Sequence, residues 1–363
     1  MYDVGICGNF GGDTEIQCGQ IYKTRELDKA LKEKYTVSEI NTHRWTKHPL
    51  RLIIQCFSLF KNSQNIVILP GKNGLKLFAQ FFCILAKYYH KPIFYAVVGG
   101  WLPETLDNNS RLIKCLNNFK GIFLETNSMA ASLNAKGLKR VYFMPNFKTL
   151  NIVGQQELVY SIEEPHRLCT FSRIFKEKGI EDAINAVKNI NDKLGRIAYT
   201  LDLYGMVESW YEQKFTEIVE TLPAYIKYKG IVSSDSCTNI LKNYYSLLFP
   251  TYYDGEGFAG TILDAYAAGI PVICTDWKYN SEIVHNNFTG LVYSVKEKNG
   301  LEDILTSILD NPNKINAYKV NCLDEAYKYD PQEAVKILTH HFAIDNNQYN
   351  QIEKSEKDDD IRK

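Results

Sequence analysis

Two acidic side chains, Glu256 and Asp264, are separated by seven residues in a stretch that also contains three glycines between the two adjoining elements. The stretch is predicted to contain a strand over Ser246–Pro250, a glycine-rich loop, a helix, and a strand over Ile270–Cys274. Eight positions along a helix make about two turns, so both carboxylates can face one side. Loop amides and the positive end of the helix dipole favour an anion there. The spacing alone leaves open that Glu256 is a surface charge in a loop and Asp264 an exposed acid on a helix.

Predicted strands and helices alternate along the rest of the chain. The predicted strands are Tyr2–Cys7, Thr36–Ile40, Asn65–Leu69, Pro92–Val98, Gly121–Leu124, Arg140–Met144, His166–Ser172, Tyr199–Tyr204 and Tyr225–Gly230. The predicted helices are Gln20–Lys34, Leu50–Phe60, Leu75–Tyr89, Arg111–Asn118, Ser128–Lys136, Asn299–Leu309, Asn313–Tyr329 and Pro331–Phe342. This alternation predicts an α/β protein whose parallel sheets are covered by helices on both faces.

A chain of 363 residues is too long for one ordinary core and suits two domains of about 150 to 200 residues. We predict a first domain over residues 1–150 and a second over residues 151–345, with the polar stretch 151–165 as linker. The last helix, Pro331–Phe342, leaves open a return to the first domain. Residues 346–363 are polar and charged, so we expect a disordered tail.

The balanced total charge hides an asymmetry between the two halves. Residues 1–150 contain 20 Lys and Arg against 10 Asp and Glu, whereas residues 151–363 contain 22 against 32. This asymmetry suggests an anionic partner for the first half, although ordinary scatter and an acidic tail are the alternative. Nine cysteines without a CxxC pair, no signal peptide and no membrane-spanning run predict a reduced, cytoplasmic chain, soluble or peripheral on a membrane.

A glycine loop follows the first predicted strand. Gly11 and Gly12 lie where a Rossmann-like fold admits a ligand backbone. The loop lacks a full GxGxxG pattern, so a dinucleotide site is not supported. A glycine turn without a ligand is an equally common reading.

The acid pair and its surroundings resemble the E-x7-E signature of family 4 (group 1) retaining glycosyltransferases. The matching residues are Glu256-Gly257-Phe258, followed by Asp264-Ala265-Tyr266-Ala267-Ala268-Gly269-Ile270-Pro271. The second acid is Asp264 where the family usually has Glu. The resemblance implies a GT-B fold with two Rossmann-like domains facing across a cleft. It also implies that Glu256 contacts the donor sugar, that Asp264 holds the ribose, and that amides of Gly257, Phe258, Ala259, Gly260 and Thr261 take sugar hydroxyls or phosphate oxygens.

A second signature of the same family resembles the run FSRIFKEKGIEDAINAV, which contains Arg173 and Lys178. The resemblance implies that these two cations hold the donor diphosphate, whose departure builds negative charge. Two solvent-exposed cations before a helix are the alternative. The resemblance further places Gly205 at the end of a strand in the donor site and Val232 beside the nucleobase.

In the first domain the resemblance implies that Gly11 and Gly12, and as an option Lys23, line the donor phosphates and the acceptor cleft. No His stands near Gly99 and Gly100, where many relatives place an acceptor-side group, and we name no base. The sequence shows no convincing metal site, so we expect a transfer that needs no metal ion or other cofactor and in which Arg173 and Lys178 stabilise the departing diphosphate.

Two apolar–aromatic segments flanked by basic residues, His43–Lys61 and Lys72–Lys91, suit helices at a membrane interface. The alternative is that these two helices only cover the sheet.

The sequence therefore predicts a hexosyltransferase-like enzyme that moves a sugar from a UDP- or GDP-linked donor to a saccharide, either free or lipid-linked, in cell-surface polysaccharide synthesis. An anionic membrane surface is a further expected partner, and nucleic acid is not. Other hypotheses are a binding or epimerising protein for sugar nucleotides and a non-catalytic, membrane-docking partner of another transferase.

Overall fold

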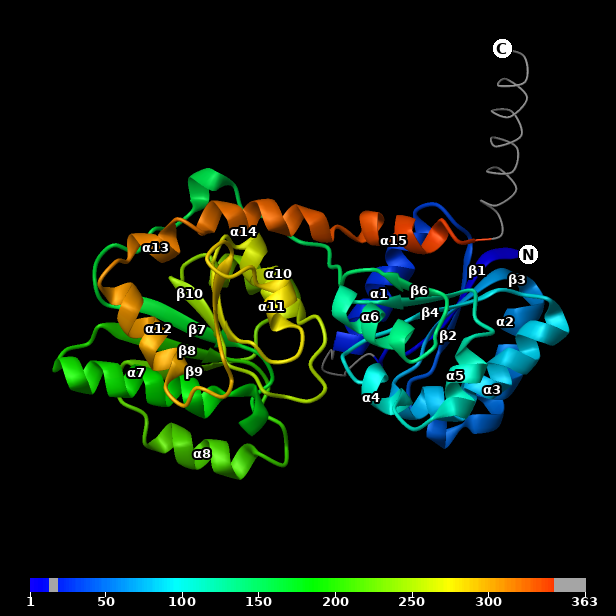
Figure 1. Ribbon diagram of the computed structural model, residues 1–363, viewed down its shortest axis with the longest axis horizontal. Coiled ribbons are helices and arrows are strands. Elements are labelled where there is room, and N and C mark those ends of the chain that lie inside the picture. The colour runs from blue at the N-terminus through cyan, green and yellow to red at the C-terminus, as the bar shows by residue number, and fades with distance from the viewer. Residues whose placement is uncertain (13–18, 343–363) are drawn as a thin grey trace, which may run out of the picture. The chain divides into compact units, whose positions relative to one another are not determined.

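The chain divides into two compact units in the computed structural model, which describes residues 1–12 and 19–342 (Figure 1). Among the described residues, the first unit contains 1–12, 19–148 and 331–342, and the second contains Thr149–Asp330. The division after Lys148 lies close to the predicted boundary at residue 150. The prediction that residues 331–345 belong to the second domain differs from this division. The predicted tail, residues 346–363, lies outside the described residues.

The first unit is built around a parallel sheet of six strands in the order β2-β1-β3-β4-β5-β6. Its strands are β1 Tyr2–Gly8, β2 Val37–Asn41, β3 Ser63–Leu69, β4 Ile93–Ala96, β5 Gly121–Leu124 and β6 Val141–Phe143. Its helices are α1 Gly19–Lys32, α2 Pro49–Asn62, α3 Lys72–Tyr89, α4 Leu102–Leu106, α5 Ser110–Leu116, α6 Asn127–Ala135 and α15 Pro331–Thr339.

Helix α15 belongs to the first unit because its apolar side chains are buried there. Val335 and Leu338 share a core cluster with residues of β1 and α1. Phe342, just past the helix, lies 5.2 Å from Phe94 between ring centroids. The Gln332 side chain donates a hydrogen bond to the Ala30 carbonyl, 3.0 Å away. The alternative that the last predicted helix, Pro331–Phe342, returns to the first domain is therefore correct.

The second unit contains another parallel sheet of six strands, in the order β12-β11-β10-β7-β8-β9. Its strands are β7 His166–Phe171, β8 Tyr199–Tyr204, β9 Ile226–Gly230, β10 Ser246–Phe249, β11 Val272–Thr275 and β12 Gly290–Tyr293. Its helices are α7 Ile180–Leu194, α8 Glu212–Glu220, α9 Cys237–Leu241, α10 Gly260–Ala267, α11 Asn280–Ile283, α12 Gly300–Leu309, α13 Asn313–Asn316 and α14 Lys319–Ala326.

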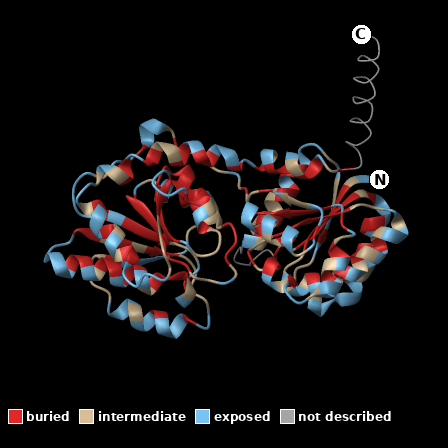
Figure 2. Cartoon of the chain, viewed as in Figure 1, coloured by how far each residue is buried: buried red, intermediate tan, exposed pale blue. Residues whose placement is uncertain are grey.

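The α/β architecture and its parallel strands are confirmed, and helices α4, α8 and α9 are additional to the prediction. Figure 2 shows buried strands at the centre of each unit and helices with an exposed outer side. The predicted helix 313–329 is interrupted, and α14 begins with a lysine whose side chain is fully buried. The ammonium group of this residue, Lys319, donates to the Tyr244 carbonyl at 3.2 Å, and burial lowers its pKa to about 8.

Within residues 1–12 and 19–342, no helix has the length and apolar character needed to cross a bilayer. The eight described cysteines are all free thiols.

Candidate functional site

The loop between β10 and α10 carries the predicted acids, and the structure buries both acidic side chains. Glu256 in the loop and Asp264 in the helix are both buried, so the readings as a surface charge and an exposed acid are wrong. Phe258 anchors the loop to the core, with its ring 5.2 Å from the ring of Tyr329. The loop is therefore held by packing, which keeps its backbone in one place.

Lys178 and Glu256 form a buried ion pair. The distance from Lys178 Nζ to Glu256 Oε2 is 2.5 Å, and the side chains are 8% and 9% exposed. The Thr251 hydroxyl donates to the same carboxylate oxygen at 3.0 Å. Two buried charges are tolerated only when they are paired and hydrogen-bonded. The structure thus brings together two residues that are 78 positions apart in the sequence.

Three aromatic rings surround the ammonium group of Lys178. Its Nζ lies 5.3 Å from the ring centroid of Tyr253, 5.6 Å from that of Phe249 and 5.9 Å from that of Phe175. Ring faces attract a cation, and more strongly where water is excluded. The three rings and the Glu256 carboxylate therefore hold the Lys178 ammonium group in a fixed position.

Gly179 allows the segment of Lys178 to approach the β10 strand end closely. Its φ is +71°, and a Cβ there would lie 2.2 Å from the carbonyl oxygen of Pro250. Only glycine satisfies both conditions without strain. Helix α7 follows directly, so the lysine and the glycine form a tight connection beside the acidic loop.

Arg173 lies close to the same aromatic rings but remains largely accessible. Its side chain is 42% exposed and its Nη1 lies 2.6 Å from Glu208 Oε1. The guanidinium carbon is 5.2 Å from the ring centroid of Phe175 and 5.8 Å from that of Tyr253, and both rings also face Lys178. The two predicted cations therefore share one aromatic surface, with Lys178 buried and Arg173 open to solvent.

Helix α10 begins beside this cluster without a side-chain cap. Ala259 is the N-cap residue and has no side chain that could accept from the first amides. The first amides of a helix lack intrahelical acceptors and suit an anion. In addition, the Thr261 hydroxyl is a buried polar atom with no hydrogen-bond partner within the described part of the chain. The helix start therefore offers both amides and a hydroxyl to a ligand.

Gly205 and Val232 follow the carboxyl ends of β8 and β9. A Cβ at Gly205 would lie 1.7 Å from the Ser172 carbonyl oxygen, and its φ is +135°. Gly205 N donates to the Gly230 carbonyl at 2.9 Å, which ties the two strand ends together. Val232 is partly buried against the core cluster that also holds Phe258. Both residues thus lie at the sheet edge predicted for the donor.

In the first unit, Gly11 and Gly12 follow β1, and part of the predicted loop, residues 13–18, lies outside the described residues. Gly11 has a φ of +73° and its carbonyl accepts from the Asn41 side chain at 2.8 Å. A Cβ at Gly12 would lie 3.5 Å from His43 Nε2. These glycines therefore sit beside the end of β2.

Lys23, predicted as an optional phosphate ligand, forms a buried ion pair in the first unit. Its Nζ lies 2.7 Å from Glu125 Oε1, and both side chains are 2% exposed. The Gly99 amide donates to the other Glu125 oxygen at 3.2 Å. Sequence reasoning missed Glu125, although an acid directly after the apolar strand β5 was a usable signal. It also missed Thr251 and the aromatic residues around Lys178, for which the spacing gave no signal.

No cluster of three metal-ligating side chains occurs among residues 1–12 and 19–342.

Residues 159–322, which include Arg173, Lys178, Glu256 and Asp264, match the family model described as glycosyl transferases group 1. The predicted resemblance to group 1 glycosyltransferases is therefore confirmed over these residues, which lie in the second unit.

The comparisons with individual proteins extend this result. The chain is 28% identical over 163 residues to the GtfA subunit of a UDP-N-acetylglucosamine–peptide N-acetylglucosaminyltransferase from Streptococcus agalactiae, covering 45% of this chain and 31% of that protein. It is 26% identical over 150 residues to the amylovoran biosynthesis glycosyltransferase AmsK of Erwinia amylovora, covering 40% of this chain and 36% of that protein. The chain thus matches only about a third of the length of these two curated relatives.

A solved structure resembles nearly the whole chain. The crystal structure of Anabaena Alr3699/HepE in complex with UDP aligns with a TM-score of 0.70 at 13% identity, over 97% of this chain and all of that chain. Together with the two parallel sheets, this likeness assigns the GT-B fold, with two Rossmann-like domains.

Proposed function

We propose that the chain is a retaining glycosyltransferase that moves a sugar from a nucleotide-sugar donor to a saccharide acceptor. The observation that carries this proposal is the buried Lys178–Glu256 pair beside the uncapped start of α10. A nucleotide-sugar presents a diphosphate and sugar hydroxyls side by side. A lysine, free helix amides and a carboxylate side by side match those groups.

In this proposal Lys178 binds the donor diphosphate from its buried position and Arg173 binds it from the accessible side. The bond from the sugar C1 to the diphosphate oxygen breaks, and negative charge builds on the leaving group. Fixed cations and helix amides stabilise that charge more in the transition state than in the ground state. Two cations and a helix start supply this stabilisation without a metal ion, so we expect transfer to persist in excess chelator.

Glu256 accepts hydrogen bonds from the sugar hydroxyls, and Asp264 accepts them from the ribose. The acceptor oxygen attacks C1 on the face that the diphosphate leaves, and its proton passes to a leaving phosphate oxygen. The new bond therefore keeps the anomeric configuration, which NMR of the product would reveal. Inversion would contradict this part of the proposal.

Titration with nucleotide-sugars tests the donor site directly. We would measure thermal shifts with UDP-, GDP-, ADP- and CMP-sugars for the wild type and for Arg173→Ala. A ligand at 100 times its dissociation constant stabilises by about 2.7 kcal/mol. Arg196→Ala is a matched control, because Arg196 is also an exposed arginine paired with a glutamate in the second unit. A shift that is lost in Arg173→Ala and kept in Arg196→Ala supports the site, and no shift in the wild type contradicts it.

We also propose that the acceptor is lipid-linked and that α2 and α3 meet an anionic membrane. On α2 the apolar side chains of Leu50, Ile54 and Phe57 are exposed. The ring of Phe57 lies 5.9 Å from that of Phe81 on α3, where Leu77, Ile84 and Tyr88 are also exposed. Each helix also has buried side chains that pack on the inner side, against the sheet. Its outer side therefore remains available as an exposed apolar surface.

Exposed basic residues, Arg51, Lys61, Lys76 and Lys87, accompany this apolar surface and complement anionic headgroups. We expect the wild type to co-sediment with phosphatidylglycerol-containing vesicles at low salt and Ile54→Gln to bind less. Ile162→Gln is the control, because Ile162 in the second unit is 68% exposed and Ile54 is 69% exposed. Equal sedimentation of both variants would contradict the membrane surface.

The same surface supports a second candidate, a non-catalytic subunit that docks on another transferase. That candidate predicts no binding of any nucleotide-sugar, so the thermal-shift panel separates the two.

A further inference from the structure

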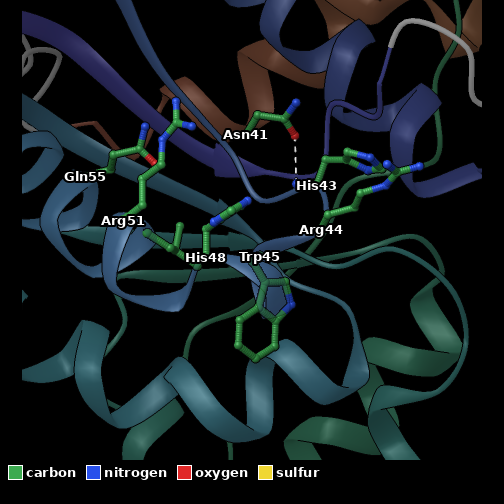
Figure 3. Close-up of a pocket in the computed structure, with 8 residues that line it drawn as sticks. Asn41, His43, Arg44, Trp45, His48, Arg51 and Gln55 are labelled. Carbon is green, nitrogen blue, oxygen red and sulfur yellow. Dashed lines mark hydrogen bonds between the residues drawn. The ribbon is translucent and has the colours of Figure 1, made fainter.

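A pocket of about 230 Å³ opens in the first unit between the end of β2 and the start of α2. His43, Arg44, His48 and Arg51 line it, together with Trp45 and Gln55 (Figure 3). None of the predicted donor residues lies in it, since those residues belong to the second unit or to the glycine loop.

Most of the side chains that line the pocket are cationic or can donate hydrogen bonds, and Leu52 adds an apolar contact. Two guanidinium groups and two imidazoles line it, and among the described residues that form its wall none is acidic. The side chain of Arg51 makes no hydrogen bond or ion pair with the described residues, so its guanidinium group is available to a ligand. Planar guanidinium groups bind phosphate oxygens in pairs of hydrogen bonds. The pocket therefore favours a compact anion with several oxygens.

Backbone features add to this preference. Helix α2 begins at Pro49, its N-cap residue His48 makes no side-chain cap, and its first turn contains no acid. The positive end of its dipole is therefore available to an anion, in addition to the side chains. Asn41 accepts from the His43 amide at 2.9 Å, which fixes the chain where it turns into the pocket.

The pocket has two neighbours that relate it to the acceptor. On one side, the Gly12 position faces His43, so the glycine loop borders the pocket. On the other, Leu50 and Ile54 are exposed apolar residues of α2, the helix that has His48 as its N-cap residue and Arg51 in its first turn. An anionic group with an apolar chain attached to it suits this arrangement.

We infer that this pocket binds the phosphate or diphosphate group that the acceptor carries. The inference deepens the proposed function and rests on it for the identity of the acceptor. The chemistry of the site itself is phosphate recognition by Arg44 and Arg51, with His43, His48 and the start of α2 donating further hydrogen bonds. A diphosphate that links a lipid to a saccharide and a free phosphate compound share this chemistry.

Calorimetric titration of the full chain with inorganic pyrophosphate tests the inference. The protein is first saturated with the nucleoside diphosphate that the thermal-shift panel selects, so that the second-unit site is filled. We expect pyrophosphate to bind the saturated wild type and Arg51→Ala to weaken this binding at least about ten-fold, the loss of a charged hydrogen-bonding partner. Gln55→Glu places a carboxylate in the pocket and should abolish binding.

Arg111→Ala is the matched control, because Arg111 is also an exposed helix arginine of the first unit and lies outside the pocket. Its affinity for pyrophosphate should stay that of the wild type. Absence of pyrophosphate binding to the saturated wild type, or equal weakening by Arg51→Ala and Arg111→Ala, overturns the inference.

A second titration with geranyl diphosphate distinguishes the two sources of the phosphate. Tighter binding than pyrophosphate, with the gain lost in Ile54→Gln, supports a lipid-linked group, and equal binding supports a free phosphate compound. The result is separable from the proposed function. If no nucleotide binds, pyrophosphate is titrated into the unsaturated chain, where its binding should still depend on Arg51. If nucleotide-sugars bind but pyrophosphate does not, only the inference about the pocket is overturned.

Discussion

The ion pair between Lys178 and Glu256 allows a sharp test of the donor site through Glu256→Gln. The substitution keeps the shape of the side chain and removes only its charge. Lys178 then remains buried among three rings without a counter-charge. The Thr251 hydroxyl and the ammonium group can still donate to the carboxamide oxygen.

Breaking a buried ion pair by removing one partner costs about 3–5 kcal/mol. Because the amide oxygen keeps its hydrogen bonds, we expect a loss of about 3 kcal/mol in the free energy of unfolding of the second unit. The double variant Lys178→Met with Glu256→Gln removes both charges and should recover about 2 kcal/mol of that loss, since contacting pairs couple by up to about 3 kcal/mol.

Urea unfolding of the wild type, both single variants and the double variant gives the coupling energy. Hydrogen–deuterium exchange of peptides from β10 and α10 would assign the transition to the second unit. The same proteins are then titrated with the nucleoside diphosphate and with its sugar conjugate. The diphosphate should bind Glu256→Gln at least as tightly as the wild type, because it replaces the lost charge, whereas the nucleotide-sugar should bind more weakly.

Two outcomes would refute this reasoning. Additive losses in the four-protein cycle would mean that the two charges do not interact energetically. Equal weakening of the diphosphate and of the nucleotide-sugar would mean that Glu256 does not act on the sugar.

The remaining predictions concern the scaffold of the second unit. Gly205→Ala should cost about 3 kcal/mol or more in urea unfolding, because its Cβ would lie 1.7 Å from the Ser172 carbonyl oxygen at a φ of +135°. Gly195→Ala should cost only about 1 kcal/mol, since its φ is +62° and no atom lies within 4 Å of the added Cβ, and equal losses would contradict the role of the close approach. For Lys319, burial lowers the pKa to about 8, so the unfolded chain binds the proton more tightly than the folded one. The unfolding free energy of the wild type, measured relative to Lys319→Met, should therefore rise by about 3 kcal/mol between pH 8 and pH 10.5, and a flat difference would exclude a charged, buried lysine below that range.

The sequence by itself determined the class of fold and supplied most of the residues that we propose for the donor site. Strand and helix alternation depends on local periodicity, which the chain shows clearly, and the strands were found to within a few residues. The acid spacing, together with Arg173 and Lys178, pointed to a group 1 glycosyltransferase because these motifs are short and local. The helix 313–329 was predicted as one element and is interrupted, and the buried Lys319 at the start of α14 gave no local signal.

Only the tertiary structure decided which charges pair and which remain accessible. Lys178 meets Glu256 across 78 positions, and Lys23 meets Glu125 across 102, because parallel strands bring distant loops to one sheet edge. Arg51 looked like one more flanking cation in a basic–aromatic segment, and the fold placed it in a pocket with a second arginine. Spacing along the chain cannot reveal such groupings, since burial and distance arise from packing between elements that are remote in sequence.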